Sequence, residues 1–170
     1  MSTDRLLETE IDVREKTKAA IRRMLAKDSD LVEDRTNEHS LGARLAGYIE
    51  DGLGEKYKVD SDYNRHLGET KKLGGRAISV DIVIHERRHD ARNLLAVELK
   101  QSGMPEEDDR KRLQKLTDKT RTPIDERYGY DHGLFLKFLR DPHRRICARL
   151  SWFKDGEEDG GEVLYAENGD

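Results

Sequence analysis

Two acids and a lysine, Asp81, Glu98 and Lys100, lie in neighbouring segments that alternate like β-strands. These segments, residues 79–87 and 93–100, are rich in β-branched and aliphatic residues and flank a short polar stretch, which predicts a hairpin. With its turn centred midway, Asp81 faces Glu98 across the sheet. Lys100 shares their face because side chains i and i+2 of a strand point the same way. The sequence therefore predicts that the three charges converge.

The opposite face of this hairpin is expected to be apolar. A polar turn over residues 88–92 sets the register, and a one-residue slip would exchange the two faces. In the predicted register the apolar side chains form facing pairs against the core: Val80 with Leu99, Ile82 with Val97, and Ile84 with Leu95.

Facing carboxylates need a counter-charge, because like charges directly opposite each other destabilise a sheet. Mg²⁺ or Mn²⁺ would remove the repulsion, since hard cations prefer oxygen ligands. Lys100 would then stand beside the metal as a fixed positive group and as a proton donor or acceptor for a reacting oxyanion. A surface salt bridge of Lys100 with Asp81 and Glu98 is the alternative, and the spacing leaves both open.

The tripeptide acid-x-Lys occurs three times in the chain, at residues 69–71, 98–100 and 109–111. By itself it therefore carries little information. Only the copy at 98–100 ends an apolar strand and has an acid opposite on a partner strand. The strand context makes this copy the candidate site.

The order of the surrounding elements points in the same direction. The expected succession is a helix at 37–49, a strand at 57–64, the two hairpin strands, a crossover helix at about 105–120 and a strand at 132–138. With Asp81, Glu98-Leu99-Lys100 and a glutamate on the first helix, residues 36–140 resemble the PD-(D/E)XK nuclease superfamily.

The resemblance implies an α/β protein with a restriction-endonuclease-like αβββαβ core, in which helices flank a mixed central sheet. It implies that Asp81 and Glu98 bind Mg²⁺ or Mn²⁺, with the Leu99 carbonyl as a further ligand and Glu38 reaching the metal, often through water. Lys100 would orient the attacking water or stabilise charge on the phosphate. Val80 stands where the superfamily often has proline, a departure that many members share.

Glu38 also has an ordinary explanation. It lies early in a helix, where an acid favourably meets the positive end of the helix dipole. Asn37 or Thr36 is a suitable N-cap for the same helix. Without the resemblance, both explanations of Glu38 stay open.

The net charge of −4 is unusual for a protein that binds nucleic acid, because phosphate contacts supply much of the affinity. The basic residues nevertheless cluster around the candidate site, and solvated surface is the alternative for each cluster. The candidates for phosphate contact are Arg65, Lys71, Lys72 and Arg76 before the Asp81 strand, Arg112, Lys115 and Lys119 on the crossover helix, and Arg144 with Arg145.

The composition fits one domain over residues 1–170, with 40% charged and 34% hydrophobic residues. We expect an extra N-terminal helix at about 4–27, a polar linker at 28–37, strands at about 146–154 and 163–165, and an acidic, glycine-rich loop at 155–161. The helix would brace the core or mediate a homodimer. A single cysteine, Cys147, and no signal peptide or membrane segment indicate a cytoplasmic protein.

The leading hypothesis is a metal-dependent phosphodiesterase that cleaves a nucleic-acid backbone, DNA before RNA, in defence or repair. One alternative is a catalytically silent module of the same fold that binds nucleic acid or a protein partner. Another is an ordinary α+β interaction domain whose salt-bridged hairpin mimics the motif. The residues do not choose a substrate sequence, because no DNA-reading module such as a helix-turn-helix is present.

Overall fold

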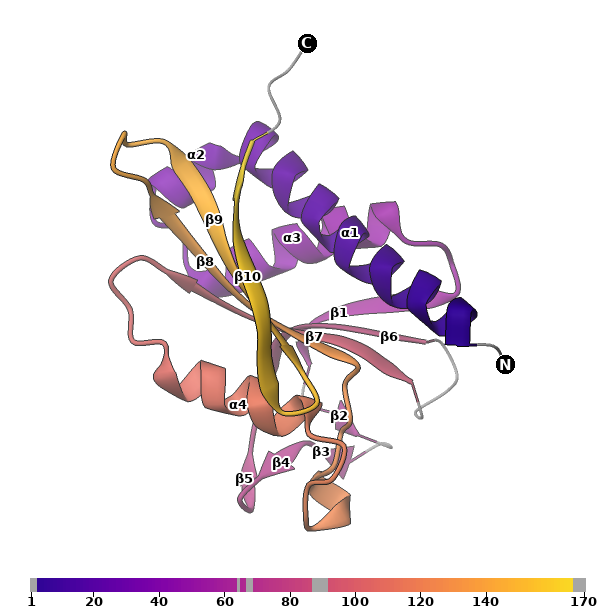
Figure 1. The fold of residues 1–170 in the computed structure, drawn as a ribbon. Coiled ribbons are helices and arrows are strands. Elements are labelled where there is room, and N and C mark those ends of the chain that lie inside the picture. The colour runs from indigo at the N-terminus through magenta and orange to yellow at the C-terminus, as the bar shows by residue number, and fades with distance from the viewer. Residues whose placement is uncertain (1–2, 64, 67–68, 87–91, 167–170) are drawn as a thin grey trace.

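A six-stranded mixed sheet forms the centre of the protein, as seen in a computed structural model (Figure 1). The structure describes residues 3–63, 65–66, 69–86 and 92–166, and within them the side chains of all but 3–12, 65, 66 and 69. Strands β7 and β8 pair in parallel, and the other neighbours are antiparallel. The strands lie in the order β1 (Tyr57–Tyr63), β6 (Val80–Glu86), β7 (Asn93–Gln101), β8 (His132–Arg140), β9 (Ile146–Lys154) and β10 (Glu157–Tyr165).

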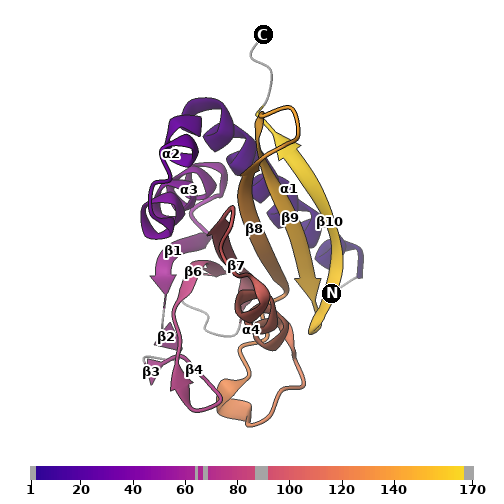
Figure 2. The same cartoon turned by 90° about the vertical axis from the view of Figure 1, so that its left-hand side faces the viewer.

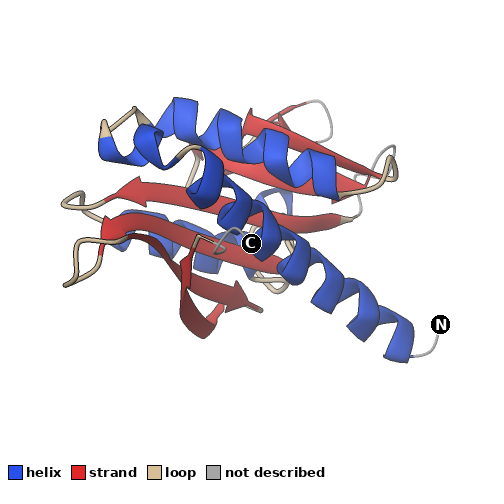
Figure 3. Cartoon of the chain, turned by 90° about the horizontal axis from the view of Figure 1, so that it is seen from above, coloured by secondary structure: helices blue, strands red, loops and turns tan. Residues whose placement is uncertain are grey.

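Helices cover both faces of this sheet (Figures 2 and 3). One face carries α1 (Thr3–Lys27) and α3 (Glu38–Gly52), with the short α2 (Ser29–Glu33) near β9. The other face carries α4 (Glu107–Thr117). Within the described residues, no helix combines the length and apolar character needed to cross a membrane.

Alternating side chains of β6 and β7 serve the two layers. The predicted pairs Ile82–Val97 and Ile84–Leu95 are confirmed, and these residues pack into the core beneath α1 and α3. Val83 and Ala96 point the other way, into the core beneath α4. One prediction is wrong: Val80 is buried in the α4 cluster and not with the other five apolar residues of the hairpin.

The expected succession of elements is present as α3, β1, β6, β7, α4 and β8, and the N-terminal helix is α1. Three expectations are wrong, the first because a five-residue helix is too short to show a helical period. The linker at 28–37 contains α2, and much of the acidic loop at 155–161 belongs to β10, which passes through a bulge between Glu158 and Gly161. Helix α4 ends at Thr117, before the predicted boundary. Of the predicted turn, residues 88–91 lie outside the described part of the chain.

The segment between β1 and β6 contains two two-stranded ladders (Figure 1). They are β2 (Arg65–His66) with β3 (Glu69–Thr70), and β4 (Lys72–Leu73) with β5 (Arg76–Ala77). Glu126 and Tyr128 hold this segment between β1 and β6, called the excursion below, in place. The Tyr128 hydroxyl accepts from Lys72 N and donates to Lys72 O, and the Glu126 carboxylate accepts from the amides of Gly74 and Gly75.

Gly133 on β8 allows α4 to lie close to the sheet. A Cβ there would be 3.1 Å from both Phe153 Cβ and Thr117 Cγ2, which is tighter than ordinary contact. Gly133→Ala is therefore expected to lower the free energy of unfolding by about 1–3 kcal/mol through overpacking. Gly47→Ala, in an open position of α3, is the control and should stabilise by about 0.5–1 kcal/mol. Urea denaturation measures both, and equal effects would contradict the close approach of α4.

Candidate active site

Asp81 lies at the end of the described pairing between β6 and β7, which begins at Ile82–Val97. Its Oδ2 accepts a hydrogen bond of 2.9 Å from the backbone N–H of Leu99, so the carboxylate bridges the two strands. Burial raises the pKa of Asp81, and this effect outweighs the lowering by the Leu99 N–H. Asp81 is thus a carboxyl group held against β7 beside Glu98.

Glu98 is the most deeply buried acid at this point, with 2% exposure. Burial, followed by the negative charge of Asp81, raises its pKa well above the ordinary value. Arg112 of α4 partly offsets this shift, because its Nη1 lies 3.1 Å from Glu98 Oε1. The predicted convergence of the two acids is therefore visible as electrostatic coupling, with a cation from α4 beside them.

Lys100 lies between two carboxylates that come from opposite faces of the sheet. Its Nζ is 3.3 Å from Glu38 Oε2 on α3 and 3.3 Å from Asp109 Oδ2 on α4. Burial lowers the pKa of Lys100, but Asp109 and Glu38 together outweigh burial and raise it. Lys100 is therefore a fixed ammonium at neutral pH, which favours the role of positive charge or proton donor over that of proton acceptor.

The start of α3 brings Glu38 to the site. Asn37 is the N-cap, as one of the two predicted candidates, and its side chain accepts from the Ser40 N–H at 2.8 Å. One turn later Gly42 faces the hairpin, where a Cβ would lie 3.6 Å from Leu99 Cδ2. This approach places the first turn of α3 over β7, so Glu38 meets Lys100.

Sequence reasoning missed Asp109 as a site residue. It is 8% exposed and contacts Lys100, and its Oδ1 lies 3.8 Å from Arg112 Nη1. A signal was present, because Asp109 precedes Leu113 by four residues and Leu116 by seven, which places an acid in the apolar stripe of the helix. An acid on the buried face of α4 needed a partner, and Lys100 and Arg112 are those partners.

Four carboxylates and two cations gather here among the described side chains: Glu38, Asp81, Glu98 and Asp109 with Lys100 and Arg112. With all of them ionised, two negative charges are left uncompensated. In the described part of the chain, however, no three His, Cys, Asp or Glu side chains form a group that could hold a metal ion together. Lys100 lies between Glu38 and Asp109. Repulsion nevertheless connects the acids, because Asp109 raises the pKa of both Asp81 and Glu98, and Glu38 raises that of Asp81.

The residues predicted to contact phosphate have different fates. Lys72 and Lys115 are exposed, as expected. Lys119 is also exposed but lies beyond the end of α4, where it pairs with Asp131 at 3.0 Å. Arg112 does not join a surface stripe with them, because it points inward to Glu98. The side chain of Arg65 lies outside the described residues.

Lys71 was expected at the surface, and that expectation is wrong. It is 1% exposed, and its ammonium lies 4.9, 4.8 and 5.7 Å from the ring centres of Tyr63, Tyr128 and Tyr130. Aromatic faces attract a cation through their quadrupole. Lys71 thus fastens the excursion to the core. In this conformation it does not face solvent, where a nucleic-acid strand would bind.

The raised pKa of Glu98 gives a pH-dependent prediction for the metal-free protein. A carboxyl whose pKa is raised by folding holds its proton more tightly in the folded state, so the free energy of unfolding falls as pH rises above the ordinary value of 4.5. Glu98→Gln removes this effect. In chelator we expect the variant to exceed the wild type in stability at about pH 8, with the gain shrinking toward pH 4.5.

Urea denaturation at several pH values tests this expectation. Glu50→Gln, at an exposed position of α3, is the matched control. A gain for Glu98→Gln that does not change with pH would contradict the assignment of the effect to the titration of Glu98.

The residues named from the sequence thus meet at one place, where α3, β6, β7 and α4 come together. Glu38, Asp81, Glu98 and Lys100 are linked by hydrogen bonds, ion pairs and electrostatic coupling, and α4 adds Asp109 and Arg112. Comparisons of the chain with protein-family models, curated proteins and solved structures return no match. The functional argument therefore rests on the geometry and chemistry of these side chains.

Proposed function

We propose that the protein is a metal-dependent nuclease with a restriction-endonuclease-like fold. The observation that carries the proposal is the meeting of Asp81, Glu98 and Lys100 with Glu38, which arrives from a separate helix. Electrostatic repulsion between buried acids is costly for a structure, and such strained charge pairs gather at functional sites. The order α3, β1, β6, β7, α4, β8 supports the fold part of the proposal.

The donor set suits a divalent cation. Asp81 and Glu98 offer adjacent carboxylate oxygens, and the two uncompensated negative charges of the cluster match the charge of Mg²⁺ or Mn²⁺. Asp81 and Glu98 would hold the ion, and the Leu99 carbonyl and a water on Glu38 remain predicted ligands. When bound, such an ion polarises a phosphoryl oxygen and lowers the pKa of an attacking water.

Side chains of the protein would supply the other contributions to the proposed reaction. The Lys100 ammonium is held by Glu38 and Asp109, so it is pre-positioned to stabilise negative charge that develops on a phosphate. The same contacts keep it protonated, which suits a role as proton donor to an oxyanion. Asp109 is then a positioning residue, because it acts through Lys100 and Arg112.

Incubation with single-stranded DNA, duplex DNA and RNA, in Mg²⁺, Mn²⁺ or chelator, tests the proposal. We expect cleavage of at least one substrate, DNA before RNA, that needs metal. Asp81→Asn should abolish it, because a neutral amide is a weak metal ligand. Asp108→Asn, at an exposed position of α4, should cleave like the wild type.

Two results would overturn the nuclease proposal. One is the absence of cleavage of all three substrates under every metal condition. The other is cleavage that Asp81→Asn leaves unchanged, because the activity would then arise elsewhere or from a contaminant.

One observation favours the alternative of a catalytically silent module that binds nucleic acid or a protein partner. Arg112 already contributes a positive charge at Glu98, and in this conformation its guanidinium takes one of the carboxylate oxygens that a metal would need. Calorimetric titration with Mn²⁺ separates the two readings. The nuclease requires binding that Asp81→Asn and Glu98→Gln each remove, whereas the silent module requires none.

A further inference from the structure

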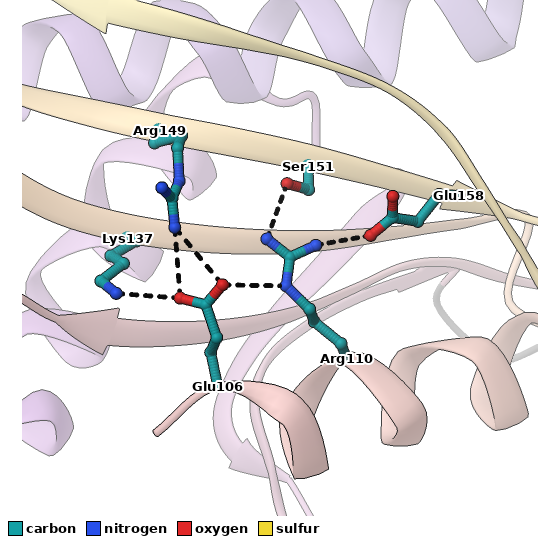
Figure 4. A network of polar contacts seen from close by, with 6 residues as sticks. All are labelled: Glu106, Arg110, Lys137, Arg149, Ser151 and Glu158. Atoms are coloured by element: carbon teal, nitrogen blue, oxygen red, sulfur yellow. Dashed lines mark hydrogen bonds and ion pairs between the residues drawn. The ribbon is translucent and has the colours of Figure 1, made fainter. Parts of the chain in front are cut away.

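Three cations from three elements converge on one carboxylate beside the candidate active site (Figure 4). Lys137 Nζ of β8 lies 2.9 Å from Glu106 Oε2, and Arg149 Nη2 of β9 lies 3.2 Å from the same oxygen and 3.4 Å from Oε1. Arg110 Nε of α4 lies 3.2 Å from Oε1. Glu106 is the N-cap residue of α4, yet its side chain makes no capping hydrogen bond within the described chain. The carboxylate is directed at the sheet and not at its own helix.

Two of these cations, Lys137 and Arg149, continue the line of Lys100 across the sheet. Lys100 is the register partner of Lys137, and Lys137 is the register partner of Arg149. Neighbouring strands are about 4.8 Å apart, so the three residues form a row that starts at the candidate active site. Asp109 faces the first member of the row, and Glu106, the residue that precedes α4, faces the other two.

The third cation is held rigidly. Arg110 Nη1 lies 2.6 Å from Glu158 Oε1, its Nη2 lies 3.2 Å from Ser151 Oγ, and its guanidinium stacks over the Phe135 ring at 4.7 Å. The remaining nitrogen, Nε, is the one that meets Glu106. Because a guanidinium fixed in this way loses little freedom on binding, it is a good donor to an anion.

An open pocket of about 490 Å³ reaches Arg110, Arg149 and Glu106 from solvent. Ser151 and two further acids, Glu158 and Glu162, also line it, and Lys137 lies behind Glu106, outside the lining. The side chains of Glu106 and Arg149 are both partly exposed to solvent. An anion can therefore approach the cations if Glu106 turns away.

We propose that Lys137, Arg149 and Arg110 form a binding subsite for a backbone phosphate of a nucleic-acid strand, and that Glu106 occupies it in the free protein. A phosphodiester has two non-bridging oxygens and one negative charge, as a carboxylate does, so Glu106 can stand in for it. The inference rests on the proposed function, because the strand would then run along the row from the phosphate at Lys100 to a neighbouring phosphate at Lys137 and Arg149. Glu106 acts as an internal competitor that the strand displaces.

Fluorescence anisotropy of a labelled single-stranded DNA oligonucleotide, measured in chelator, tests this inference without any cleavage. Glu106→Gln is expected to tighten binding by roughly 3–10-fold, because it removes the negative charge that Lys137 and Arg149 face, while Arg110 keeps its ion pair with Glu158. Glu107→Gln, the exposed neighbour, removes the same charge outside the subsite and should change affinity less than about twofold.

The cations give the opposite expectation. Lys137→Met with Arg149→Met should weaken binding by roughly tenfold and reduce the dependence of log affinity on log salt by about 0.7 for each lost phosphate contact. Lys111→Met, at an exposed position on the same helix, is the control. Inorganic phosphate should compete with the oligonucleotide at the subsite, whereas polyglutamate of equal charge should compete less well.

Several results would overturn the subsite. If Glu106→Gln binds the oligonucleotide no tighter than Glu107→Gln and has a lowered Tm, the role of Glu106 is only to fasten α4 to the sheet. If polyglutamate competes as well as inorganic phosphate does, the three cations form a surface that binds anionic partners without selecting phosphate. Failure of the nuclease proposal is a separate outcome, because it appears as absent metal-dependent cleavage while the metal-free binding shifts of Glu106→Gln and of the Lys137→Met, Arg149→Met double variant persist.

Discussion

Lys100→Met is expected to bind Mn²⁺ at least as tightly as the wild type and to lose cleavage by roughly 10²–10³-fold. The rate should fall because the Lys100 ammonium, fixed between Glu38 and Asp109, is the group proposed to stabilise negative charge on the phosphate. Metal binding should survive because Asp81 and Glu98 are untouched and a competing positive charge is gone. Single-turnover cleavage and calorimetric titration with Mn²⁺ measure the two effects separately.

Lys111→Met serves as the matched control, since Lys111 is exposed and pairs only within α4 among the described residues. It should retain wild-type cleavage. Lys100→Met that cleaves at the wild-type rate would remove Lys100 from the mechanism. A loss of both cleavage and metal binding would instead assign Lys100 to the assembly of the site.

Arg112→Met is expected to destabilise the metal-free protein by about 1–3 kcal/mol and to become the variant most strongly stabilised by Mn²⁺. Without the guanidinium, buried Glu98 faces Asp81 with no cation at 3.1 Å. The cost stays below the 3–5 kcal/mol typical of a stranded buried charge, because the raised pKa of Glu98 allows it to take up a proton. Bound metal would then supply the missing positive charge.

Thermal unfolding in chelator and in excess Mn²⁺ measures this effect. At a metal concentration 100 times the Kd, binding contributes about 2.7 kcal/mol, which is enough to offset the loss. Lys115→Met, an exposed position of α4, should show neither the loss nor the extra gain. An Arg112→Met protein that Mn²⁺ does not stabilise beyond the wild type would favour the catalytically silent module.

The register of the hairpin could be predicted because strand alternation has a strict period of two and one face had to be apolar. Ile82 and Ile84 therefore located Val97 and Leu95, and the position of Asp81 beside Glu98 followed. Val80 escaped this logic because the described pairing of β6 with β7 begins only at Ile82, whereas Val80 pairs with Tyr63 of β1 and is buried beneath α4.

The contribution of α4 could not be read in the same way. The periodicity of Leu113 and Leu116 predicts which face is buried, but it does not say that Arg112 leans over the strand end to Glu98. That contact depends on how closely Gly133 lets the helix approach the sheet, which is a tertiary property. The burial of Lys71 could not be predicted for the same reason. One of its three tyrosines precedes it in the sequence, and the other two follow long after it.

Because Tyr63, Tyr128 and Tyr130 surround Lys71, chemical labelling of this lysine can measure local opening of the protein. Amine-reactive reagents modify a lysine only when its amine meets solvent, and Lys71 is 1% exposed while its neighbour Lys72 is exposed. Lys72 therefore supplies an internal standard one residue away. The ratio of the two labelling rates reports how often the excursion detaches from Tyr128 and Tyr130, and thus the free energy of that local opening.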